Sequence, residues 1–128
     1  MKLLLDTLIL LWAAAGTLPP KALSYITDEA NELYFSSASI WEIIMKERFS
    51  RDDFFVNPHS LHHGLITNGY QELRIAAKHA LAVHSLPEIH NDPFDRILIA
   101  QAVTEGLHLI TADAKVSAYA APIIFVQK

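Results

Sequence analysis

Five short apolar segments recur along this chain, and a segment with helical features separates each from the next. They lie at residues 2–5, 33–36, 72–75, 107–111 and 123–126. These segments show almost no alternation of polar and apolar residues, which is typical of strands buried on both faces. Strands that alternate with helices predict a parallel sheet covered on both sides. The predicted fold is therefore α/β, a three-layer α/β/α sandwich with a central, mainly parallel sheet.

The helices between these strands are predicted from their start and stop signals. They span residues 7–14, 19–30, 40–46, 58–67, 76–84 and 93 to near 106, with a helical turn at 113–118, a polar loop at 50–57 and a connection at 86–91. Several begin with proline, and Gly106 is a natural helix end. In the second helix Leu23 and Ile26 are expected to face inward, and Ser37 or Ser39 is expected to cap the third.

The chain is long and apolar enough for one hydrophobic core. It has 128 residues, 52% of them hydrophobic, so residues 1–128 are expected to form a single domain. It contains no cysteine, which excludes disulfides and thiolate zinc sites and favours the reducing cytoplasm. The net charge of −4 argues against a simple basic nucleic-acid-binding protein. Bound cations would reverse the local negative charge of an acidic site, so the net charge does not exclude an enzyme that binds nucleic acid through such cations.

Residues 1–15 loosely imitate a secretory leader, because Lys2 precedes a leucine-rich run and a stretch of alanines. Asp6 lies inside that run, where a carboxylate is costly. Removing the segment would also delete the first predicted strand, so we expect it to belong to the mature protein. No other apolar run reaches the length of a membrane span, and no membrane association is expected.

Acidic residues stand where elements meet one predicted edge of the sheet. Asp6 follows the first strand and Asp113 follows the fourth, while Asp92 and Asp95 open the helix at residue 93. A helix that precedes a parallel strand begins at the edge where the strands have their carboxyl ends. In open α/β sheets ligands bind beyond this edge. We therefore expect these acids to meet there.

Glu42 is the only charged residue among residues 40–45. A glutamate on an otherwise apolar helix face is costly to bury unless it is paired or bound to a metal. Carboxylates that lie close together repel, so a cluster of them persists with cations between them. Magnesium and manganese suit all-oxygen ligands. Two such ions can activate a water and stabilise the leaving oxygen of a phosphodiester.

Each acid also has a simpler explanation. Asp6, Asp92 and Asp113 can each cap the helix that follows, and capping is the favoured explanation for Asp92 and for Asp6 taken alone. Glu42 can form a modest surface pair with Lys46, four residues further on. Because all of these acids are predicted at the same edge, a shared metal site explains them together.

Four motifs resemble the PIN domain and, more narrowly, the VapC-type ribonuclease toxins of bacterial type II toxin–antitoxin pairs. They are LLDT at 4–7, SASIWEI at 37–43, DPFDR at 92–96 and TAD at 111–113. The resemblance covers essentially the whole chain, with the motifs in the right order and at the right separations. DPFDR is the specific motif, whereas Leu-Asp-Thr by itself is weak.

The resemblance implies a Mg²⁺- or Mn²⁺-dependent endoribonuclease with a quartet of acids. Asp6, Glu42 and Asp95 would hold the principal ion directly. Asp113 would act through water or on a weaker second ion, and Asp92 would be peripheral.

Further residues are placed around this quartet. Thr7, Ser39 and Thr111 are positioned to hydrogen-bond the carboxylates. Arg96 is predicted either to contact phosphate or to pair with an acid. His90 could touch substrate or a carboxylate, but a loop histidine without a role is the favoured interpretation.

The resemblance also implies partners. RNA would be the substrate, and members of this family are commonly cytoplasmic homodimers that a small cognate antitoxin inhibits. The C-terminal segment of the antitoxin would lie across the acidic groove, where an arginine or lysine would displace or mimic the metal.

Two other functions compete with this one. A metal-dependent phosphatase built on a first-strand aspartate nucleophile typically needs a second aspartate two residues on, where this chain has Leu8. A catalytically silent PIN-fold module that binds RNA or a partner would be favoured by the loss of one or more acids, and all four are present.

Overall fold

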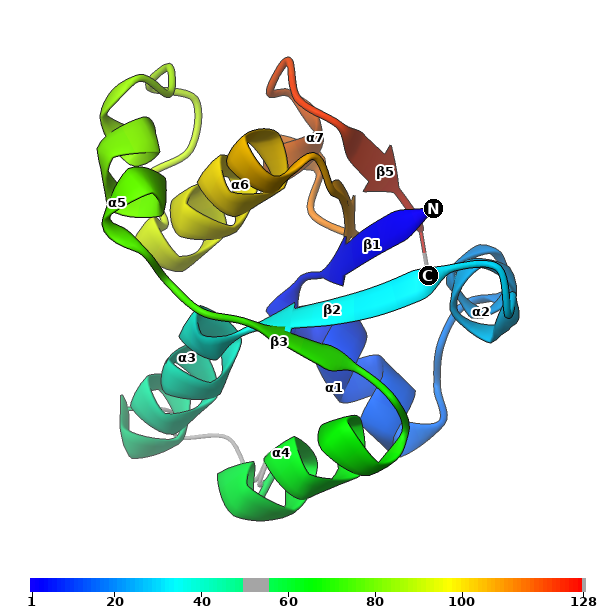
Figure 1. Cartoon of the computed structure of the whole chain (residues 1–128). Coiled ribbons are helices and arrows are strands. Elements are labelled where there is room, and N and C mark those ends of the chain that lie inside the picture. The colour runs from blue at the N-terminus through cyan, green and yellow to red at the C-terminus, as the bar shows by residue number, and fades with distance from the viewer. Residues whose placement is uncertain (50–55, 128) are drawn as a thin grey trace.

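The computed structural model describes residues 1–49 and 56–127, so most of the loop predicted at 50–57 lies outside the described residues. Figure 1 shows helices on both sides of a central sheet. The elements run in the order β1 (Lys2–Leu5), α1 (Thr7–Ala15), α2 (Pro20–Thr27), β2 (Glu32–Ser36), α3 (Ser37–Phe49), α4 (Pro58–Thr67), β3 (Gln71–Leu73), α5 (Ala77–His84), α6 (Pro93–Glu105), β4 (His108–Thr111), α7 (Ala114–Ser117) and β5 (Ile123–Phe125).

The sheet has five strands, all parallel, in the spatial order β3-β2-β1-β4-β5. This arrangement confirms the predicted parallel sheet. The chain first extends the sheet on one side of β1 and then crosses to the other side to form β4 and β5. The order therefore reverses between β1 and β4, the place where ligands bind in open α/β sheets.

Successive side chains of a strand point to opposite faces of the sheet, and the leucines of the central strand β1 make both of its faces apolar. Leu3 and Leu5 are fully buried in a cluster with residues of α1, α2, α3 and α4. Leu4 is fully buried on the opposite face with residues of α6 and α7. Figure 1 shows the same division, with α5 packed alongside α6. The predicted three-layer α/β/α sandwich is confirmed.

The second helix differs from the prediction in its end and in its buried face. It ends three residues earlier than expected, because Asp28 accepts a hydrogen bond from the N–H of Ala30 in a turn. Ala22 is fully buried and Ile26 partly so, whereas Leu23 is 46% exposed. Successive helical residues are rotated by about 100°, so the face through positions 22 and 26 turns Leu23 toward solvent. The inward placement of Leu23 was wrong.

Among the other boundaries that differ from the prediction, those of β3 (predicted at 72–75) and α3 (predicted at 40–46) are explained by local contacts. β3 ends at Leu73 rather than at residue 75, because its last register partner is Ser36, where β2 itself ends. α3 begins directly after that serine. The Oγ of Ser36, rather than that of Ser37 or Ser39, accepts the hydrogen bond from the N–H of Ala38 at the start of α3.

The longest described helices, α3 and α6, have 13 residues each. A helix needs about 20 apolar residues to cross the hydrocarbon core of a bilayer. Within residues 1–49 and 56–127, no helix combines the length and the apolar character for such a crossing.

Candidate metal centre

A cavity of about 730 Å³ opens beyond the carboxyl ends of β1 and β4. We name it the acidic cavity. Its lining includes the four acids of the predicted quartet together with two further acids, a histidine and a lysine: Asp6, Glu42, Asp95, Asp113, Glu47, Asp92, His90 and Lys46. The acidic cavity thus lies where the strand order reverses.

Three of the acids reach the cavity as helix caps. Asp6 accepts a hydrogen bond from the N–H of Ile9 at 2.9 Å, and Asp113 accepts one from Lys115 at 2.8 Å. Asp92 accepts from the first turn of α6. In each case the acceptor is Oδ1, which leaves Oδ2 for another partner. The capping explanations are therefore correct, and they do not compete with cation binding.

Glu42 is buried, with 2% of its surface exposed, and both of its oxygens have partners. The hydroxyl of Thr7 donates to Oε1 at 2.5 Å, and Ser39 shares a hydrogen bond with that hydroxyl at 3.0 Å. The ammonium of Lys46 pairs with Oε2. Although burial disfavours its charge, the hydrogen bond and attraction to Glu42 raise the pKa of Lys46. The predicted pair exists, but its carboxylate lies inside the protein rather than on the surface.

Asp6 is buried at the floor of the cavity, and burial raises its pKa to about 7. Hydrogen bonds from Thr111 and from the N–H of Ile9 act in the opposite direction, and the negative charges of Asp95 and Glu42 add to the increase. Thr111 is fully buried, and its hydroxyl oxygen also accepts a hydrogen bond from the N–H of Asp113.

Burial also raises the pKa of Asp95. The hydrogen bond from His90 lowers it, while the charges of Asp92 and Glu42 raise it further. Two neighbouring carboxyl groups whose charged forms are both disfavoured are the groups that a divalent cation would stabilise. The oxygen-rich donor set also suits Mg²⁺ and Mn²⁺. The residues present therefore fit such an ion.

We expect the metal-free protein to lose about 3 kcal/mol of unfolding free energy between pH 5 and pH 8. Asp6 keeps its proton in the folded protein up to about pH 7, but it ionises near 3.8 in the unfolded chain. The folded state binds more protons between these values, so its stability is greatest below the lower one and declines up to the higher one. Urea denaturation at both pH values measures the effect.

The matched variants for this prediction are Asp6→Asn and Asp28→Asn. The first removes the buried titrating group and should flatten the pH dependence. The second makes the same change on an exposed residue that does not line the cavity and should leave the pH dependence intact. An equally steep profile in Asp6→Asn would contradict the assignment.

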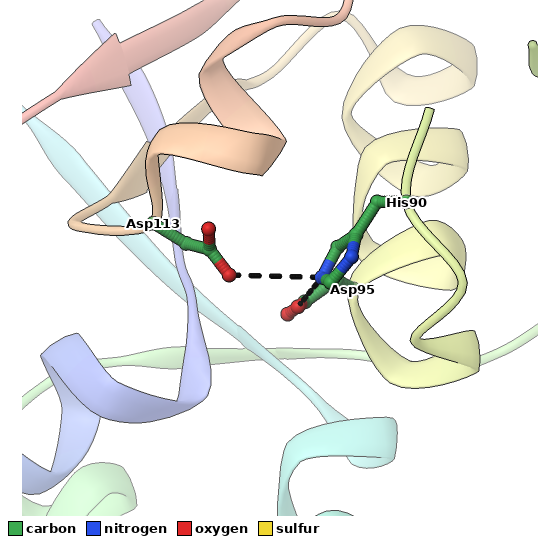
Figure 2. A group of neighbouring side chains, drawn as sticks. All are labelled: His90, Asp95 and Asp113. Carbon is green, nitrogen blue, oxygen red and sulfur yellow. Dashed lines mark hydrogen bonds and ion pairs between the residues drawn. The ribbon is translucent and has the colours of Figure 1, made fainter. Parts of the chain in front are cut away.

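His90 lies between two acids of the quartet, so the contact with a carboxylate that was the less favoured expectation is present. Its Nε2 is 2.8 Å from Oδ2 of Asp95 and 3.6 Å from Oδ2 of Asp113. Figure 2 shows these three side chains converging. One ligand atom from each lies within 4.8 Å of the other two. Asp6 and Glu42 line the same cavity, but among the described residues they do not join this closer group.

Arg96 holds the connection between α5 and α6. Its Nη1 and Nη2 donate to the carbonyls of Val83, Leu86, Pro87 and His90, and Nη1 also donates to the hydroxyl of Tyr119. Within the described residues, the guanidinium donates its hydrogen bonds to these acceptors and to no carboxylate. Of the two alternatives for Arg96, pairing with an acid is thus not found among the described residues. No local pattern in DPFDR indicates this role, because the acceptors come from another segment.

The chain matches the PIN domain family over residues 3–122. It is similar in structure to a chain of VapBC2 from Rickettsia felis bound to a promoter DNA fragment, with a TM-score of 0.73, 15% identity and coverage of 100% of this chain and 99% of that one. A chain of DNA-bound VapBC from Salmonella typhimurium gives 0.70 and 16%, with 98% of both chains covered. A toxin–antitoxin complex from Klebsiella pneumoniae gives 0.66 and 20%, with 98% of both covered.

Comparison with curated proteins found no match. At 15–20% identity the solved structures support the fold alone.

Proposed function

The chain belongs to the PIN domain family, and from this premise we propose that it is a Mg²⁺- or Mn²⁺-dependent endoribonuclease that acts as the toxin of a type II toxin–antitoxin pair. The family match confirms the resemblance drawn from the four motifs. One observation carries the proposal: the four acids, which are spread over more than a hundred residues of sequence, all line the acidic cavity. Burial there raises the pKa values of Asp6 and Asp95, which favours a cation among them.

In this proposal the four acids differ in how they bind the cation. Asp6, Glu42 and Asp95 hold the principal ion, and Asp113 acts through water or on a weaker second ion. A bound Mg²⁺ or Mn²⁺ would lower the pKa of an attacking water and partly neutralise the negative charge of the phosphodiester. Thr7 and Thr111 keep Glu42 and Asp6 in place through their hydroxyl groups.

Lys46 pairs with Glu42 at the mouth of the cavity. Its side chain is 65% exposed, whereas that of Glu42 is 3% exposed, so the ammonium can leave while the carboxylate stays. A cation bound by Glu42 would release Lys46, which then reaches an RNA phosphate as a positive charge. The same pair supports the proposed antitoxin contact, because it shows that a flexible cationic side chain fits beside Glu42.

The proposed partners follow from the same cavity. A small antitoxin would cover it and present an arginine or lysine to the acids. The three similar structures are described as VapBC or toxin–antitoxin complexes, which supports such a partner for this chain. We further propose that the protein is a cytoplasmic homodimer formed of single domains spanning residues 1–128.

RNA cleavage by the purified protein tests the proposed activity. We expect cleavage in Mg²⁺ or Mn²⁺ and none in excess EDTA, with activity restored when the cation is added back. Because water rather than the ribose 2′-hydroxyl is the proposed nucleophile, the products should carry no 2′,3′-cyclic phosphate. Undiminished cleavage in EDTA, or cyclic phosphate ends, would contradict the proposal. Release of phosphate from a monoester with intact RNA would instead favour the phosphatase.

A further inference from the structure

Three side chains from separate segments meet at one side of the acidic cavity. His90 comes from the connection before α6, Asp95 from the first turn of α6, and Asp113 from the residues after β4 (Figure 2). Nε2 of His90 is 2.8 and 3.6 Å from the two carboxylate oxygens. Adjacent ligands of an octahedral ion with bonds of about 2.1 Å lie about 3 Å apart. The spacing therefore suits three ligands of one ion.

The backbone of His90 is held by hydrogen bonds to other segments, and its side chain is mostly buried. The hydroxyl of Tyr119, a buried residue, accepts a hydrogen bond from the N–H of His90 at 2.9 Å. Arg96 donates to the carbonyl of His90 at 3.3 Å and to the same hydroxyl at 3.1 Å. The side chain of His90 is only 13% exposed. Ligands held in place by such supporting contacts bind with a smaller entropic cost.

The two carboxylates are held by their own helices. Oδ1 of Asp113 accepts the hydrogen bond from the N–H of Lys115, which leaves Oδ2 directed at His90. Asp95 lies in the first turn of α6, whose backbone Asp92 caps, and its Oδ2 is hydrogen-bonded to Nε2 of His90 at 2.8 Å. The fold thus brings the three donor atoms together, and the hydrogen bond between His90 and Asp95 already joins two of them.

We propose that His90 is a direct ligand, with Asp95 and Asp113, of a cation at the second ion position of the proposed function, and that its nitrogen makes this position prefer first-row transition ions such as Mn²⁺ over Mg²⁺. Carboxylates and water suit Mg²⁺, whereas imidazole is a better ligand for transition metals. In the metal-free protein Nε2 of His90 is hydrogen-bonded to Asp95, so coordination through the Nε2 lone pair requires the neutral ring with its proton on Nδ1. The inference rests on the metal centre of the proposed function and adds a nitrogen donor to it.

Binding of the metal alone, without RNA, tests the inference. Calorimetric titration with Mn²⁺ and with Mg²⁺ compares the wild type with His90→Ala and His90→Asn. We expect His90→Ala to weaken Mn²⁺ binding by about 10- to 100-fold and to leave Mg²⁺ binding little changed. His90→Asn replaces the nitrogen donor by an oxygen and should bring the two affinities closer together. His63→Ala, an exposed histidine on α4, is the matched control and should bind both ions as the wild type does.

A second measurement gives its decisive result on the wild type alone. Pulsed electron paramagnetic resonance of Mn²⁺ bound to the wild type should show coupling to an imidazole ¹⁴N nucleus, and His90→Asn should lack it. Absence of that coupling in the wild type would overturn the inference. So would tighter Mn²⁺ binding in His90→Ala, because His90 would then compete with the ion rather than hold it.

The outcomes also separate this inference from the proposed function. If the wild type binds both ions and His90→Ala binds them equally well, the nitrogen ligand is refuted and the metal centre stands. If the wild type binds neither ion, both the inference and the proposed metal-dependent activity fail.

Discussion

Replacing Asp95 by asparagine is expected to lower metal-dependent RNA cleavage by about a thousand-fold or more. Removing one charged ligand from a catalytic cation forfeits several kcal/mol of transition-state stabilisation, and each 1.4 kcal/mol is about a factor of ten in rate. The amide keeps the size of the side chain. Initial rates on a defined single-stranded RNA, measured at saturating Mn²⁺, give the comparison.

The metal-free Asp95→Asn protein should fold normally and be slightly more stable than the wild type at neutral pH. Burial raises the pKa of Asp95, so its charged form is disfavoured in the fold, and the neutral amide removes that penalty. Asp28→Asn makes the same charge change on an exposed residue and should cleave RNA at the wild-type rate. Wild-type cleavage by Asp95→Asn would refute the role of Asp95 as a ligand.

Replacing Arg96 by alanine is expected to lower the free energy of unfolding by about 3 kcal/mol or more. The guanidinium donates to several backbone carbonyls and to Tyr119, and each partly buried acceptor left without a donor costs roughly 1–3 kcal/mol. Water can replace some of these donors because the residues that supply the carbonyl groups are not buried. Urea denaturation of the metal-free protein measures the loss.

Arg74→Ala is the matched control for Arg96→Ala. The Arg74 side chain is 89% exposed, and it pairs with Glu72 at the surface, so its removal should change stability by less than about 0.5 kcal/mol. Arg96→Lys keeps the charge but loses the planar fork and should recover only part of the stability. Full stability of Arg96→Ala combined with weaker RNA binding would instead indicate a phosphate contact.

Local sequence was sufficient for much of the fold and for part of the cavity. Strand β1 was evident because Leu3, Leu4 and Leu5 are apolar on both faces, and the three leucines are fully buried. The caps formed by Asp6 and Asp92 were also predictable. A cap joins residues two or three positions apart, so the sequence spacing determines whether the contact can form. Alternating strands and helices then predicted the parallel sheet and the edge where these acids meet.

Tertiary packing decided the environment and the partners of each side chain. Glu42 and Lys46 are one helical turn apart, yet only the packing of α1 against α3 brings Thr7 to Glu42 and buries it. The direction in which Leu23 faces likewise depended on which side of a short helix meets the sheet.

The sequence alone therefore determined the layered fold, the helix caps and the edge of the sheet at which the acids gather, since each follows from spacings of a few residues. Tertiary structure alone decided that Arg96 holds a connection and that His90 stands between Asp95 and Asp113. Asp113 lies 23 residues after His90, beyond α6 and β4. Contacts over such separations form only once helix and strand have packed, and no short pattern along the chain encodes them.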